Sequence, residues 1–298
     1  MESLTAPART QYTCFMTDYV STFETPSDPR LGRHVRHDPR SWQYAFTAVD
    51  TSTLKSVRHR SEIPTLDQGQ LGSCTGNAAT KCLSYDPFWA EKDVQKVLGP
   101  DEKSDEEYAV GVYSAATQID DYPGSYPPQD TGSDGLSVAK VLKKRNLISG
   151  YQHAFSLEAL LSALAKQPVI VGTQWHQDMF NPAQDGRLTV TGKVAGGHEY
   201  CLDELDVENQ RIWLQNSWGD GWGKEGRAYL TWDDMRTLLK NQGDCTIFAP
   251  LGSPPPTPPD PDPQTAFVAA AKTWLSFKHV AKVNVAFEED LKKYLSTL

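Results

Sequence analysis

The chain has 298 residues, of which 39% are hydrophobic and 10% aromatic, and its formal net charge is -9. This length and composition can supply a sizeable apolar core and exclude wholesale disorder. The negative net charge gives no support to binding a polyanion, so we expect no nucleic-acid partner. No run of about 18 apolar residues occurs, so we expect no membrane span and no membrane partner.

Residues 1–60 are rich in Pro, Arg, His, Ser and Thr and show little periodicity. This pattern predicts an extended N-terminal arm that drapes over the main domain as a permanent part of the fold, with a short inhibitory pro-segment as the alternative. The basic cluster at residues 30–40 predicts a solvated basic face, because no nucleic-acid-binding motif accompanies it.

Apolar residues then recur at helical spacing, separated by turn residues. Helices are predicted over residues 77–86, 106–119, 136–148 and 156–167. The charged stretch at 91–107 is predicted to be a surface excursion.

The pattern changes to short strand-like runs divided by Gly, Asp and Asn. These runs cover residues 168–175, 186–194, 199–207, 211–217 and 226–232. Helices first and strands second is the order expected of an α+β protein with two packed lobes.

The end of the chain has a different composition. Residues 253–263 contain seven prolines in eleven positions, which predicts a stiff spacer between a main domain at 61–252 and a helical segment at 264–298. That segment is too short to form its own core, so we expect it to dock. It either tethers the chain to an assembly partner or another protomer, or folds back on the main domain.

Cys74 follows Gly72 and Ser73 at the point where a helix is predicted to begin. The unpaired N–H groups and the dipole of a helix start lower the pKa of a thiol, which makes it a better nucleophile. His198 comes directly after two glycines at the entry to an apolar strand, a position suited to a general base. Asn216, at a strand end, can accept the imidazole N–H and fix its orientation.

Two longer strings extend this pattern. The first, DQGQLGSC, resembles the Gln-Gly-x-x-Gly-Ser-Cys motif of papain-family cysteine peptidases and places Gln68 six residues before Cys74. The second, NSWGDGWG, resembles that family's Asn-Ser-Trp-Gly-x-x-Trp-Gly. His198 and Asn216 lie 124 and 142 residues after Cys74, near the family's spacing. The resemblance covers residues 61–252.

The resemblance implies a papain-like two-lobed fold, with a helical left lobe and an antiparallel, barrel-like right lobe. It implies that Cys74 is the nucleophile of a peptidase, His198 its base and acid, and Asn216 the residue that orients His198. The side chain of Gln68 and the N–H of Cys74 would form the oxyanion hole. No cofactor and no metal are implied, and the expected partner is a protein or peptide substrate.

Other matched positions are expected to lie against the substrate. Trp218 and Trp222 would be sheltering aromatic residues, and Gly72 and Ser73 would line the substrate-binding site. Glu199 stands where the family has a small apolar residue in the pocket for the second substrate residue. If Glu199 faces that pocket, it should favour a basic or polar substrate side chain; the alternative is that it points to solvent.

The sequence also departs from the family pattern. Leu71 replaces a cysteine that commonly forms a disulfide, and Thr75 replaces the aromatic residue after the nucleophile. The family's double-glycine cleft strand is only echoed at residues 131–137. With five cysteines at no metal-ligand spacing and no signal-peptide core, these features favour a bacterial or phage type in the cytoplasm or associated with a virion.

Two alternatives remain open at this point. The same Cys-His-Asn core can transfer an amide or cleave an isopeptide bond, because the acyl-thioester is shared and only the acceptor differs. A catalytically silent module that binds peptides or partners is the other. The silent module is disfavoured because the sequence has all four residues of the family's active site, Gln68, Cys74, His198 and Asn216. Binding alone needs no matched thiol and imidazole.

Overall fold

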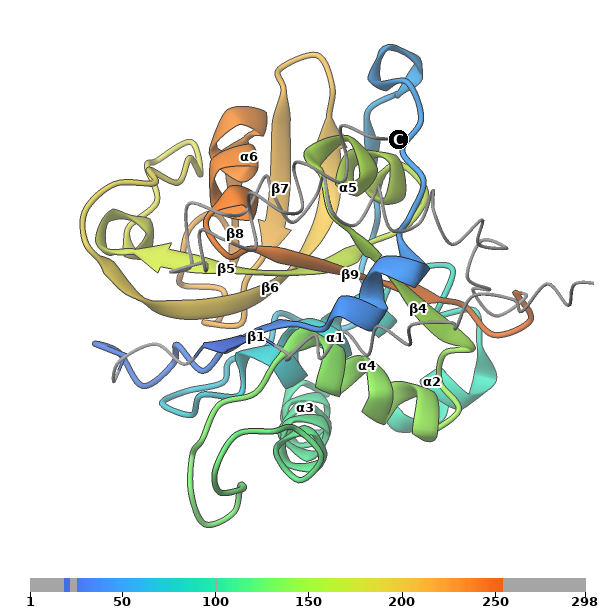
Figure 1. The fold of residues 1–298 in the computed structure, drawn as a ribbon, viewed down its shortest axis with the longest axis vertical. Helices are drawn as coiled ribbons and strands as arrows, with labels where there is room; N and C mark the ends of the chain where they lie inside the picture. The colour runs from blue at the N-terminus through green and yellow to red at the C-terminus, as the bar shows by residue number, and fades with distance from the viewer. Residues whose placement is uncertain (1–18, 22–25, 100, 254–298) are drawn as a thin grey trace, which may run out of the picture.

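The helices and the strands of the described residues gather in two lobes, one above the other in Figure 1. The computed structural model describes residues 19–21, 26–99 and 101–253. The predicted docking segment at 264–298, nearly all of the proline spacer and Cys14 lie outside the described residues.

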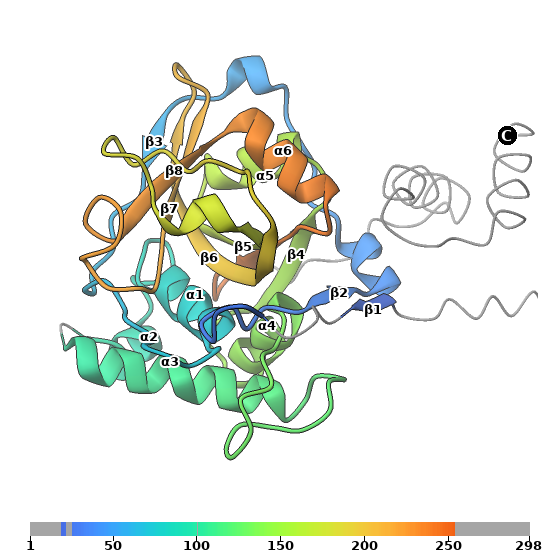
Figure 2. The same cartoon turned by 90° about the vertical axis from the view of Figure 1, so that its left-hand side faces the viewer.

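The helical lobe is built around one buried helix. Every residue of α1 (Cys74–Leu83) is buried, and the helix lies against α3 and the strands above it (Figure 2). The other helices of this lobe are α2 (Lys92–Val97), α3 (Glu102–Thr117) and α4 (Gly135–Lys144). Their apolar faces form one core cluster, which also takes in Ile170, Cys201 and Phe248 from the strands. The two lobes therefore share a packed interface below the sheet.

The charged stretch at residues 91–107 lies mostly at the surface, as its composition predicts, but it is largely helical. It contains α2 and the first turns of α3, whose N-cap Asp101 accepts the N–H of Lys103. The anchor is Val94, which is fully buried in the helical core. Leu98 joins Val94 in this core, but two buried apolar residues among many charges carry too little periodicity to reveal a short helix.

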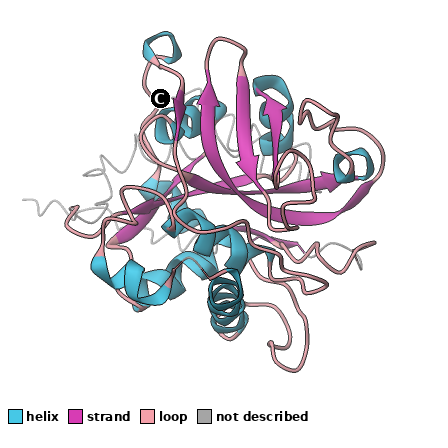
Figure 3. Cartoon of the chain, turned by 180° about the vertical axis from the view of Figure 1, so that it is seen from behind, coloured by secondary structure: helices cyan, strands magenta, loops and turns pink. Residues whose placement is uncertain are grey.

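The other lobe is an antiparallel sheet, seen from behind in Figure 3. Among the described residues it has seven strands, in the order β4-β9-β5-β6-β7-β8 with β3 paired to β6. Their bounds are β3 (Val57–Arg58), β4 (Gly150–Ala154), β5 (Val169–His176), β6 (Val194–Asp206), β7 (Arg211–Gln215), β8 (Arg227–Thr231) and β9 (Asp244–Ala249). Helices α5 (Leu157–Leu164) and α6 (Trp232–Lys240) pack on it. This architecture confirms the predicted α+β class.

Two sequence predictions for this lobe need correction. Residues 186–193 form no strand, because Gly186 and Gly192 both adopt positive φ and turn the chain at each end. The strand predicted at 226–232 ends one residue early, because Trp232 is the first residue of helix α6, which begins at a capping box between Thr231 and Asp234. The helix is followed by β9, which the periodicity did not predict.

The described part of the N-terminal arm lies between the two lobes as far as β2 (Val35–His37) and then follows the sheet lobe (Figure 2). It contains β1 (Tyr19–Ser21) paired with β2, followed by two short 3-10 turns, η1 (Pro39–Tyr44) and η2 (Thr51–Thr53). It continues into β3, which joins the main sheet.

The basic cluster of this arm is not the solvated face that the sequence predicts. Arg33 is 1% exposed and Arg36 is 8% exposed, and each pairs with a carboxylate of the main domain. Buried guanidinium groups need such partners, because an unpaired charge in the interior is costly. The arginines therefore attach the arm to the two lobes.

Candidate active site

Cys74 is the first residue of α1 and lies at the interface of the lobes. Its N-cap, Ser73, makes no side-chain capping bond; the Ser73 hydroxyl instead donates to Oδ1 of Asn77 at 2.9 Å. No acidic residue occupies the first turn. The free N–H groups of the helix start are thus left to act on the Cys74 thiol, where they stabilise a thiolate.

His198 stands on β6 and is held by Asn216, which directly follows β7. Nε2 of His198 lies 2.8 Å from Oδ1 of Asn216, and the same oxygen accepts the backbone N–H of Ser217 at 2.9 Å. An amide oxygen can only accept, so Nε2 carries the proton of the neutral ring. Nδ1 is then the basic nitrogen, and it is buried without a hydrogen-bond partner. Asn216 therefore leaves Nδ1 available to take a proton.

Aromatic rings enclose this pair. The Trp218 and Trp175 rings each lie 4.8 Å from the His198 ring, measured between centroids. Trp222 contacts Trp218 at 5.5 Å and donates its Nε1–H to the carbonyl of Phe180. Trp222 thus supports Trp218, while Trp175, which the motif analysis missed, packs directly against the histidine. Its only sequence signal is its place at the end of a predicted strand.

Gln68 lies at the same interface and is 5% exposed. Its Oε1 accepts the hydroxyl of Ser217 at 2.6 Å, which fixes the direction of the amide. Its Nε2 donates to the carbonyls of Leu71 at 2.6 Å and Arg30 at 3.1 Å. Gln68 therefore points an N–H donor at the chain that occupies this place, which here is the N-terminal arm.

The arm lies directly over the nucleophile. Gly32 forms a bridge with Gly197, the residue before His198, and its Cα lies 3.2 Å from where a Cβ on Gly72 would stand. A Cβ built on Gly32 would itself come within 1.9 Å of the Gly72 carbonyl oxygen. Only glycine permits this approach. Cys74 and His198 consequently have no exposed surface.

Burial also sets the protonation of the pair. It raises the pKa of Cys74 to about 12, although the backbone amides of Glu199 and Gly32 oppose the rise. It lowers the pKa of His198 to about 4, against the hydrogen bond that Nε2 donates to Asn216. With the arm in place, a neutral thiol and a neutral imidazole are therefore favoured over the thiolate–imidazolium pair that the resemblance implies.

The remaining sequence-predicted residues fall around this centre. Gly72 lies against the arm, and its N–H donates to Asp130 at 2.8 Å. Ser73 is buried, with its hydroxyl engaged by Asn77. Glu199 does not point to solvent: it is completely buried beside Arg33 of the arm.

The described residues contain no group of three or more His, Cys, Asp or Glu side chains that could hold a metal ion. Within the same part of the chain, no helix is both long and apolar enough to cross a bilayer. The four described cysteines, Cys74, Cys82, Cys201 and Cys245, are free thiols.

The chain has the fold of papain-like cysteine proteases. Xylellain, a cysteine protease from Xylella fastidiosa, superposes with a TM-score of 0.59 over 78% of this chain and 100% of its own, at 17% identity. A procathepsin B from Trypanosoma congolense gives a TM-score of 0.51 over 74% and 87% of the two chains, at 11% identity. No protein-family model matches the sequence, and no curated protein matches it.

Proposed function

We propose that the chain is a cysteine peptidase in which Cys74 is the nucleophile and His198 the general base and acid. The observation that carries this proposal is the His198–Asn216 pair, which leaves a partnerless basic Nδ1 at the lobe interface where α1 begins at Cys74. The backbone N–H of Glu199, the residue after His198, lies close enough to the Cys74 thiol to lower its pKa, which supports placing His198 and Cys74 in the same part of the interface.

The reaction follows from these positions. Nδ1 of His198 takes the thiol proton, and the sulfur of Cys74 attacks the substrate carbonyl carbon, forming the C–S bond and moving an electron pair to the oxygen. The Cys74 N–H and Nε2 of Gln68 donate to that oxyanion. His198 returns its proton to the departing amine as the C–N bond breaks. A water then hydrolyses the acyl-thioester, with His198 taking the water's proton.

Alkylation by a peptidyl epoxide, read out by intact mass, tests this proposal. The full-length chain should gain one adduct, slowly because the arm covers the thiol. The adduct should be absent in Cys74→Ala, strongly slowed in His198→Ala and unaffected in Cys245→Ala. Labelling that is independent of His198 would refute the thiol–imidazole pairing. Product analysis with added amine and with isopeptide substrates then separates hydrolysis from amide transfer.

Replacing Gln68 by alanine is expected to lower kcat for peptide hydrolysis by about a hundredfold, the usual cost of one oxyanion-hole donor. Epoxide alkylation of Cys74 should change much less, because thiol activation does not use this amide. Gln70→Ala is the matched control, since Gln70 is exposed two residues away. Equal effects of both substitutions on kcat would remove Gln68 from the oxyanion hole.

A further inference from the structure

The arm is fixed on both sides of the cleft by its backbone. The N–H of Arg33 donates to the carbonyl of Gly197 on β6 at 3.0 Å. On the other side, the Ser133 N–H donates to the Gly32 carbonyl at 2.9 Å, and the His34 N–H donates to the Ser133 carbonyl at 2.8 Å. These bonds flank Arg33 and set the direction in which its side chain leaves the arm.

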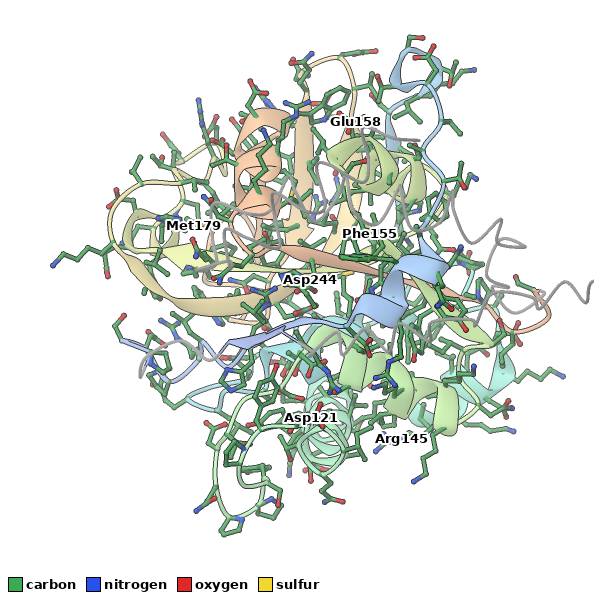
Figure 4. The ribbon with its side chains drawn as sticks, in the orientation of Figure 1. Asp121, Arg145, Phe155, Glu158, Met179 and Asp244 are labelled. Carbon is green, nitrogen blue, oxygen red and sulfur yellow. The ribbon has the colours of Figure 1, made fainter. Side chains whose placement is uncertain are left out.

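That side chain enters a buried acidic pocket. Nη2 of Arg33 donates to the carbonyl of Gln242 at 2.8 Å and forms an ion pair with Asp244. Asp244, labelled in Figure 4, lies where the sheet lobe meets the arm. Glu199 is completely buried beside the guanidinium, and neither of its carboxylate oxygens has a hydrogen-bond partner.

Two glycines give the pocket its shape. A Cβ on Gly172 would come within 2.5 Å of both Nε of Arg33 and Oε2 of Glu199. A Cβ on Gly135 would come within 2.7 Å of Oε1 of Glu199. Any side chain at either position would close the space, so these glycines leave room for an extended guanidinium beside two carboxylates.

The pocket is suited to arginine more than to other side chains. Glu199 is completely buried and Asp244 is 19% exposed, and two carboxylates this close are costly without a cation, so the pocket favours a positive charge. Asp244 and the Gln242 carbonyl both meet Nη2, whereas Nε and Nη1 have no hydrogen-bond partner and Glu199 contributes its charge from beside the group. A planar guanidinium with five donors can meet such acceptors at once, whereas an ammonium is a single point.

We propose that Glu199, Asp244 and the Gln242 carbonyl form a recognition site for an arginine side chain of the peptide substrate, and that Arg33 is a tethered occupant of that site. The proposal rests on the peptidase function above. Because Gly32 lies over Cys74, a side chain in the place of Arg33 belongs to the residue next to the one presented to the thiol. An arginine-containing peptide and the arm therefore compete for one site, with the arm favoured by its attachment.

Peptide binding to a thiol-free protein tests this site separately from catalysis. The open variant is the full-length chain with Gly32→Val, Arg33→Ala and Cys74→Ala. Fluorescence polarisation compares a labelled hexapeptide that carries one arginine with the same peptide carrying citrulline, its neutral isostere. The arginine peptide should bind about thirtyfold more tightly, and Asp244→Asn should remove that difference. Glu208→Gln, on an exposed turn, is the matched control and should leave it unchanged.

Equal binding of the two peptides, or a preference that survives both Asp244→Asn and Glu199→Gln, would overturn the arginine site. Failure of the alkylation test with success here would instead leave a peptide-binding site without the proposed chemistry. If the open variant does not fold, the Arg33→Ala chain serves alone. The arginine peptide should then protect Cys74 from the epoxide while the citrulline peptide does not, and equal protection would refute the site.

Discussion

A full-length chain that carries Gly32→Val is expected to react with a peptidyl epoxide at Cys74 about a hundredfold faster than the unaltered chain. The added Cβ would stand 1.9 Å from the carbonyl oxygen of Gly72, which is backbone at the start of α1 and cannot rotate away. Overpacking of this kind costs about 3 kcal/mol, and each 1.4 kcal/mol shifts an equilibrium about tenfold. The arm must therefore leave the cleft for much of the time.

The pH dependence of alkylation distinguishes release of the arm from a general loosening of the fold. In the unaltered chain, burial holds the pKa of Cys74 at about 12, so the slow rate should keep rising with pH through pH 9. Once the arm leaves, solvent and the imidazole reach the thiol, its pKa falls, and the rate should level off near neutral pH. Only Cys74, among the described cysteines, should show this change.

The control for this experiment is another glycine-to-valine change. A Cβ on Gly111, in α3, meets no atom within 4 Å, so Gly111→Val should leave the alkylation rate and its pH profile unchanged. Circular dichroism and thermal melting are the measurements that check whether both variants fold. A folded Gly32→Val chain that reacts no faster than the parent would show that the arm is not what limits access to Cys74.

The arm joins the cleft through specific contacts as well as apolar burial. Leu31 is 3% exposed and packs into the core of the sheet lobe, and the Arg30 guanidinium lies 4.1 Å from the centroid of the Trp218 ring. Buried ion pairs such as Arg33–Asp244 add little net stability compared with apolar contacts but are costly to break one-sidedly. The cluster therefore specifies where the arm lies more than it strengthens its attachment.

The candidate residues of the site were accessible to sequence reasoning because local chemistry identifies them. Cys74 stands at a glycine-marked helix start, and Asn216 begins a tryptophan-rich string after a strand. The structure places both at the lobe interface with His198, whose ring is held by Asn216. Their assignment as catalytic residues stays a prediction until the thiol is shown to react.

The occupant of the cleft could not be predicted in the same way. Arg33 and Asp244 are 211 positions apart, and no local pattern specifies a contact across that distance. The basic cluster reads as a surface feature because charge alone does not reveal burial. Trp175 could not be predicted as part of the site either, because an aromatic residue at a strand end carries no local signal that it packs against His198.

The helices and strands also divide into those that a local sequence pattern predicts and those that it does not. The buried helix α1 and the long strands β5 and β6 carry enough apolar residues at regular spacing to be predicted. The segments that failed are short: α2 has one buried residue, and β9 has six residues after a loop. Such elements form because the neighbouring strands or helices supply the burial, which is tertiary information that a local window lacks.

Replacing His198 by alanine in the Gly32→Val chain is expected to lower kcat/KM for peptide hydrolysis by at least about a thousandfold. The residues of a catalytic unit act together, so the loss of one removes most of the rate acceleration. Without the imidazole, Cys74 has no acceptor for its proton, and the departing amine has no donor. Asn216→Ala should cost less, since it frees the ring but leaves Nδ1 able to titrate. Both rates are measured with the arginine-containing peptide and with a peptide that lacks arginine.

The matched control is His59→Ala, which replaces a partly buried histidine whose Nε2 lies 2.8 Å from the carbonyl of Leu164 and which has no contact with His198 or Asn216 among the hydrogen bonds of the described residues. Its hydrolysis rate should stay near that of the Gly32→Val parent. The loss in His198→Ala should appear in kcat with both peptides, because proton transfer does not depend on the arginine pocket. A His198→Ala chain that folds and hydrolyses within tenfold of its parent would show that His198 is not the base. Loss of only the arginine preference would assign His198 to substrate binding, since the reacting atoms would then be served by another group.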